Sequence, residues 1–67
     1  MITKQGGCID ARHRTVWVRL EYDSKREKTT VEIHTRKGGK RLATNGIIGQ
    51  HAKTYYDKLN TYFFRHE

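Results

Sequence analysis

The sequence predicts an α+β fold, in which a small antiparallel β-meander of two to three strands packs against one C-terminal α-helix. Two observations carry this prediction. Residues 15–22 and 29–35 alternate between apolar and polar side chains, which is the period of a β-strand. From residue 47 to residue 64, apolar side chains recur at steps of three and four, which is the period of an amphipathic helix. With 67 residues in all, we expect residues 1–67 to form a single domain.

The two alternating runs are joined by a short polar segment, residues 23–28, so we expect them to form an antiparallel hairpin. In such a hairpin one face of each strand is apolar and turns toward the helix. The residues predicted on this face are Val16, Val18, Leu20, Val31 and Ile33.

Two glycine pairs lie on either side of the predicted hairpin, and each is expected to interrupt or turn the chain. Gly38-Gly39 favours a tight turn, from which residues 40–44 return as a third short strand with Leu42 on its apolar side. Gly6-Gly7 is expected to break the chain, leaving residues 8–11 as at most a short edge strand.

The helix is predicted over residues 47–64, with Thr44 or Asn45 as its N-cap. Its apolar stripe consists of Ile48, Ala52, Tyr55, Leu59, and Tyr62 or Phe63. This stripe leaves Tyr56 and Phe64 outside. Aromatic side chains at a helix surface are typical of interface anchors, so Tyr56 and Phe64 are the candidate protein-interface residues, for a homodimer or a host protein. The alternative is a wide apolar helix face seated in a concave sheet.

The charge predicts the class of partner. Lysine and arginine number 14 against 7 acidic residues, for a formal net charge of +7, and residues 29–46 are the most electropositive stretch. Basic domains bind polyanions because neutralising phosphates releases condensed counterions. We therefore expect a nucleic-acid partner, DNA slightly before RNA. An acidic protein partner, or a charge that serves solubility alone, is the alternative.

Candidate nucleic-acid contacts fall into two groups. Alternation turns Trp17 and Arg19 away from the helix, and His34 and Arg36 share that face on the next strand, where aromatic rings stack on bases and cations hold phosphates. The turn adds a cationic tip whose glycines allow close approach, consisting of Arg36, Lys37, Lys40 and Arg41. The alternatives are that Trp17 covers the second sheet face against the N-terminal segment and that the tip is merely solvated.

The layout of three short strands and a C-terminal helix is similar to that of the arm-binding domains of some tyrosine recombinases and of a family of plant DNA-binding domains. Those domains read a major groove with the sheet. The resemblance concerns layout alone, since it includes no diagnostic motif. It implies that the outward residues Trp17, Arg19, His34 and Arg36 would make the contacts.

Other kinds of site find little support. Cys8 is the single cysteine, so an internal disulfide and a cysteine-based zinc site are excluded, and the four histidines match no metal-ligand spacing. No acid–base pair implies a shaped catalytic site, so we expect no enzyme activity and no cofactor. Residues 1–7 lack the apolar stretch of a signal peptide and no window could span a bilayer, which favours the cytoplasm. The rival function is a phage- or plasmid-type inhibitor that binds a host protein.

Overall fold

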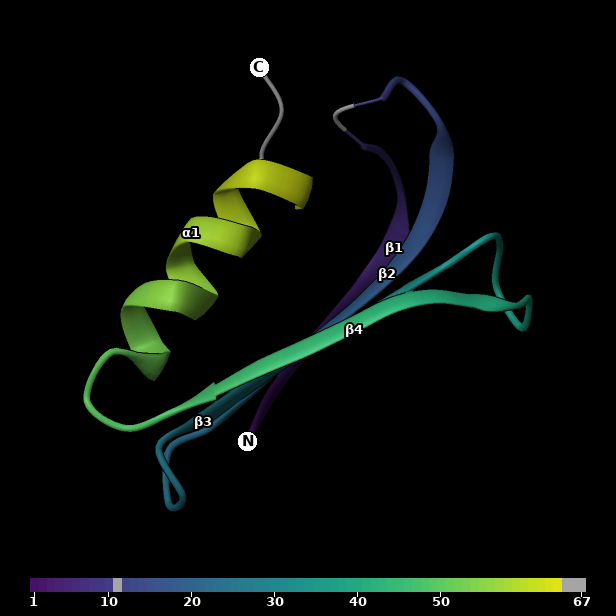
Figure 1. Cartoon of the computed structure of the whole chain (residues 1–67). Coiled ribbons are helices and arrows are strands. Elements are labelled where there is room, and N and C mark those ends of the chain that lie inside the picture. The colour runs from purple at the N-terminus through teal and green to yellow at the C-terminus, as the bar shows by residue number, and fades with distance from the viewer. Residues whose placement is uncertain (11, 65–67) are drawn as a thin grey trace.

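The structure, a computed structural model, describes residues 1–10 and 12–64 and shows an α+β fold. Its single sheet has the strand order β1-β2-β3-β4, every neighbouring pair is antiparallel, and the helix covers one face (Figure 1). The fold class is as predicted, but the meander has four strands rather than two to three. The elements are β1 (Ile2–Ile9), β2 (Thr15–Asp23), β3 (Lys28–His34), β4 (Arg41–Ile48) and α1 (Ala52–Phe64).

The central hairpin of β2 and β3 forms as the alternation predicts. Leu20 lies opposite Val31, and Val18 lies opposite Ile33. Val18 and Leu20 are fully buried, because the two central strands carry β-branched and leucine side chains on the face that α1 covers. This pair of strands therefore supplies most of the sheet's share of the core.

The prediction that Gly6-Gly7 breaks the chain is wrong. Both glycines lie inside β1, where they pair with Val18 and Trp17 of β2. Glycine in a strand costs roughly 0.5–1 kcal/mol, and the hydrogen-bond ladder along an eight-residue strand outweighs that cost. The segment 8–11 was predicted as a short edge strand. Its first two residues belong to β1, and residue 11 lies outside the described residues.

The predicted boundary between strand and helix is also wrong. Ile47 and Ile48 belong to β4, where they pair with β3, and the helix begins at Ala52 instead of residue 47. β-Branched residues favour the strand, and Gly49 then turns the chain at a φ of +121°, a conformation that suits glycine. The backbone N–H of Gly49 donates to the carbonyl of Glu27 at 2.8 Å, which fixes this turn against the sheet.

Neither predicted N-cap residue caps the helix. Thr44 and Asn45 both lie in β4, and the Thr44 hydroxyl donates to the Val31 carbonyl across the strand pair at 3.3 Å. The start of α1 is held differently. The fully buried Thr29 hydroxyl donates to the carbonyl of Ala52 at 2.6 Å.

The buried stripe of α1 consists of Ala52, Tyr56 and Phe63, so the helix is rotated from the predicted orientation. The prediction that Tyr56 lies outside the buried stripe is wrong: its ring packs against Tyr22 with centroids 6.0 Å apart. Phe64 is half-buried beside Gly6, and Tyr62 is the exposed aromatic residue of this helix. Ile48, which was predicted to open the stripe, lies in β4 and is not part of the helix.

Candidate nucleic-acid interface

The topology brings two loops to the same end of the sheet. Because neighbouring strands are antiparallel, the segment between β1 and β2, described at residues 10 and 12–14, and residues 35–40 between β3 and β4 lie at the same end of the sheet (Figure 1). The loop at residues 24–27 leaves it at the other end, beside the N-terminus. We call the first of these the cationic end. Its basic residues are Arg12, Arg14, Arg36, Lys37, Lys40 and Arg41.

The loop at residues 35–40 holds its shape through its own backbone. The N–H of Thr35 donates to the carbonyl of Lys40 at 2.9 Å, and the N–H of Gly39 donates to the carbonyl of Arg36 at 2.8 Å. Gly38 has a φ of +74°, the left-handed conformation that favours glycine. The loop is therefore a compact tip. The chain turns back at the Gly-Gly pair as predicted, but through a loop of residues 35–40 in which Gly38 has a positive φ and Gly39 does not, and β4 spans Arg41–Ile48 rather than residues 40–44.

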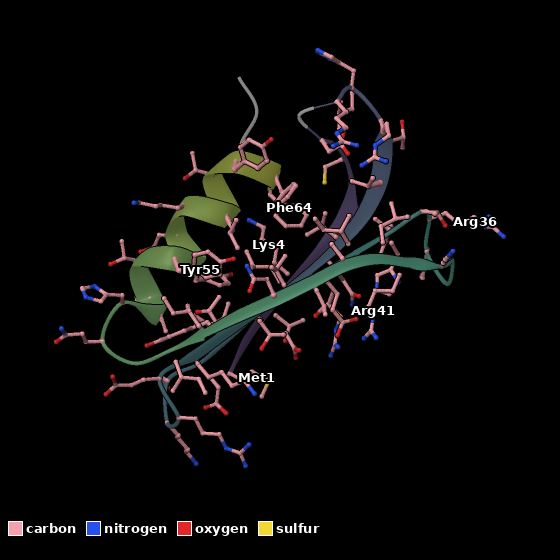
Figure 2. All side chains as sticks on the ribbon, in the orientation of Figure 1. Met1, Lys4, Arg36, Arg41, Tyr55 and Phe64 are labelled. Carbon is pink, nitrogen blue, oxygen red and sulfur yellow. The ribbon has the colours of Figure 1, made fainter. Side chains whose placement is uncertain are left out.

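The four predicted turn cations lie on this tip and at the start of β4, and all four are exposed. Figure 2 shows Arg36 at the loop and Arg41 where β4 begins. Among the described residues, no carboxylate comes within 4 Å of the charged nitrogen atoms of these four side chains. Their charges are therefore available to an external anion.

Trp17 lies on the uncovered face of the sheet and close to this tip. It pairs with His34 on one side and with Gly7 on the other, and glycine has no side chain to cover the ring. The ammonium group of Lys37 lies 5.6 Å from the ring centroid, within cation–π distance. The structure thus brings Trp17 of the sheet face and Lys37 of the loop into contact.

Arg19 lies on the same face but is engaged by two acids. Its guanidinium group is 3.1 Å from a Glu21 carboxylate oxygen and 4.0 Å from a Glu32 carboxylate oxygen. The centre of the outer sheet face therefore holds one arginine against two carboxylates, so the positive charge of Arg19 is compensated. The alternation of the sequence places Glu21 and Glu32 on the same face as Arg19, but the prediction of Arg19 as a nucleic-acid contact did not take into account that these two acids compensate its charge.

His34 is held by two oxygen atoms. Its Nε2 lies 3.1 Å from Glu32 Oε1, and its Nδ1 lies 3.3 Å from the Gly39 carbonyl oxygen. Both partners are acceptors, so a protonated ring donates to both and a neutral ring donates to one. His34 thereby ties the end of β3 to the loop, and its ring nitrogens are not turned toward an external ligand.

The loop at residues 10–14 is organised by Asp10. Its carboxylate accepts from the backbone N–H groups of Arg12 and Arg14 at 2.9 Å each, and from the side chain of Arg14 at 2.9 Å. The backbone N–H of Arg14 is the largest reason that the pKa of Asp10 is lowered, and the Arg14 side chain adds to it. The charge of Arg14 is thus partly compensated by Asp10. Arg12 is exposed, and the strand topology places it at the cationic end.

The opposite end of the sheet mixes its charges. Lys25, Arg26 and Lys28 alternate there with Asp23 and Glu27. Asp23 accepts backbone hydrogen bonds from Lys25 at 3.0 Å and Arg26 at 3.4 Å, and its carboxylate lies 3.9 Å from the Arg26 side chain. Positive charge is therefore concentrated at one end of the molecule.

The two candidate protein-interface residues occupy different environments. Tyr56 is part of the core, and Lys53 lies over its ring with the ammonium group 5.8 Å from the centroid. Phe64 packs at the edge of the core, with the ammonium group of Lys4 5.7 Å from its ring centroid (Figure 2). Tyr56 is thus not available as a surface anchor in this structure.

Within residues 1–10 and 12–64, no three histidine, cysteine or acidic side chains gather where they could hold a metal ion. Over the same residues, no helix has the length and apolarity that crossing a bilayer requires. Comparison of the chain with protein-family models, with curated proteins and with solved structures found no match.

Proposed function

We propose that the protein binds nucleic acid, DNA in preference to RNA, by laying its cationic end along the phosphate backbone. The observation that carries this proposal is the gathering of exposed, uncompensated cations on two loops at one end of the sheet. Phosphate contacts of this kind supply most of the affinity of non-specific binding. A cytoplasmic location fits this role, because the single thiol of Cys8 remains reduced there.

The loop at residues 35–40 suits insertion along a groove or a backbone. It is a narrow β-ribbon tip with two glycines, and two-stranded ribbons fit the major groove of B-DNA. Trp17 lies beside it and could stack on a base or pack against a sugar when Lys37 moves to a phosphate. In this proposal Arg19 and His34 are held by Glu21 and Glu32 and shape the sheet face. They are not the main contacts with the nucleic acid.

A matched pair of variants tests the proposal. One variant replaces Arg36, Lys37 and Lys40 with alanine, and the control replaces Lys25, Arg26 and Lys28 at the opposite end. Both remove one arginine and two lysines, so the net charge changes equally. Fluorescence-anisotropy titrations against duplex DNA, single-stranded DNA and RNA over a salt series measure affinity and its salt dependence.

We expect the first variant to bind at least about tenfold more weakly and to reduce the slope of log K against log salt by about three, one for each lost phosphate contact. The control should retain most of the affinity, and Trp17 emission should change on binding. Equal losses in both variants would contradict the assigned surface. Absence of binding to all three probes at about 50 mM salt would reject the function itself, and an acidic protein partner would then be the next candidate.

A further inference from the structure

The two edges of the sheet are protected to different degrees. On β1, Lys4 pairs with the buried Leu20 and so points toward the helix side, with its ammonium group over the Phe64 ring. Such an inward charge is a common device that keeps an edge strand from pairing with another chain. On β4, residues 42–48 contain no charged residue and no proline. The β3–β4 register irregularity falls at the Arg41 end, so residues 43–48 pair regularly with β3 and form an open edge.

The helix leaves this edge uncovered. Every β4 residue except Ile47 is exposed, including those on the side that faces α1. Between β4 and α1 lies a groove of about 280 Å³, whose apolar lining consists of Val31, Ile33, Ala43, Tyr55, Leu59 and Phe63. Leu42 and Ile48 are also exposed, at 43% and 72%. An unprotected strand thus coincides with apolar surface that the monomer does not bury.

We propose that β4 pairs with β4 of a second copy, antiparallel, about a two-fold axis at Asn45, and joins the two sheets into one of eight strands. Both helices then lie on the same face of the joined sheet, and the two grooves face each other across the axis. The inference does not depend on nucleic-acid binding, and it is tested in the absence of nucleic acid.

The side chains select this register. With Asn45 on the axis, Ala43 lies opposite Ile47 of the second copy on the helix side, so a large side chain meets a small one beside the groove. Leu42 lies opposite Ile48 of the second copy, which pairs the two most exposed apolar residues of the strand. An axis at Thr44 would instead place Ile47 and Ile48 opposite Arg41 and Lys40.

The charge distribution fits the same arrangement. Antiparallel pairing puts the cationic end of each copy beside the opposite end of the other, where Asp23 and Glu27 lie among the cations. The two cationic ends are thus kept apart, and the strands that meet are uncharged over residues 42–48. The net charge of +7 therefore opposes this interface less than it would oppose a contact between like ends.

Cysteine cross-linking tests the register. Residues directly opposite in an antiparallel pair have Cα atoms about 4.5–5.5 Å apart, within the usual range for a disulfide. Asn45→Cys should therefore form a covalent dimer on mild oxidation. Thr44→Cys is the matched control, because in this register Thr44 lies opposite Gly46 of the second copy and should cross-link far less. The wild-type chain, whose Cys8 is buried, controls for the native thiol.

Molar mass in solution tests the dimer itself. Light scattering over a concentration series should give twice 7.9 kDa for the wild-type chain. Asn45→Lys places like charges opposite each other on the axis and should give the monomer mass, while Gln5→Lys adds the same charge to β1 and should leave the dimer intact. Circular dichroism verifies that both variants fold. A monomeric wild-type chain at millimolar concentration, or equal cross-linking of the two cysteine variants, would overturn the proposal.

Discussion

At the scale of single residues, Cys8 shows how position in the sheet controls chemistry. It lies on the helix side of β1 opposite Val16, and its side chain is part of the core cluster. Burial is the main reason that the pKa of its thiol is raised, and the carboxylate of Asp10 adds to the effect. The thiolate is the reactive form of cysteine, so both effects suppress reactivity.

We expect Cys8 to react slowly with iodoacetamide in the folded protein at neutral pH and rapidly in urea. The sign of the linked pH effect follows from the raised pKa. The fold favours the protonated thiol, so this contribution to stability is present at neutral pH and is lost as alkaline pH ionises the thiol. Ser24→Cys in the exposed β2–β3 loop is the internal control and should react rapidly in both conditions. Equal rates at the two positions in the folded chain would show that Cys8 is accessible.

At the scale of secondary-structure elements, the rotation of α1 determines which aromatic residues stabilise the fold. Tyr56 is 6% exposed, whereas Tyr62, nearly two turns later, is 48% exposed and makes an edge contact with Phe63 at a centroid distance of 4.8 Å. The two residues are chemically identical, so the difference between them is one of position alone.

We predict that Tyr56→Ala lowers the free energy of unfolding by about 3–5 kcal/mol, because it opens a cavity between the helix and β2. Tyr62→Ala should cost roughly 0.5 kcal/mol. A chain of 67 residues has a total stability of only about 3–10 kcal/mol, so the first variant should be marginally folded or unfolded. Urea denaturation followed by circular dichroism measures both. Equal costs would contradict the burial of Tyr56, and a larger cost for Tyr62→Ala would favour the helix orientation predicted from the sequence.

The elements that the sequence predicted correctly are those in which pattern and environment agree. β2 and β3 alternate cleanly because each has one buried face and one open face. The errors concern residues that fit two patterns. Ile47 and Ile48 are compatible with a helical stripe and with a strand, and only the length of the neighbouring β3 decides between them. Gly6-Gly7 is strand because β2 offers a partner edge, which local propensity does not contain.

Some properties of the candidate site could likewise be predicted from the sequence, and others could not. The turn cations could be named from composition and the glycine pair, and the structure places them together. Two properties required the topology: that loop 10–14 lies at the same end as loop 35–40, and that loop 24–27 lies at the other. The contact of Arg19 with Glu32 depends on cross-strand register, which a single-sequence pattern specifies only after the pairing is known, whereas its pairing with Glu21 lies within one strand and follows from the alternation.

At the scale of the whole molecule, one helix on one face of the sheet leaves the other face open. That face carries Trp17 near the cationic end, and at its centre the charge of Arg19 is compensated by Glu21 and Glu32. A ligand approaching from this side meets positive potential mainly at the loops. Recognition in our proposal is therefore confined to one end of a flat particle, whose principal extents are 31 × 27 × 17 Å.

This asymmetry predicts a kinetic effect. In stopped-flow experiments that follow Trp17 emission, the association rate with duplex DNA should fall steeply with salt, while the dissociation rate changes less. Replacing Arg36, Lys37 and Lys40 with alanine should slow association by about tenfold or more, whereas the control at Lys25, Arg26 and Lys28 should slow it less. An unchanged association rate in the first variant would show that the loops act only after contact.

The separation of charge along the sheet also gives each single copy of the chain a positive end, whereas in the antiparallel dimer proposed above the two positive ends would point in opposite directions. A body with its positive charge at one end experiences a torque in the field of a polyanion, and that torque acts over about 10 Å at 0.1 M salt, before any atoms touch. The loop end should therefore turn toward the phosphates during approach, so that orientation is selected in free diffusion and most encounters begin with the binding end in front.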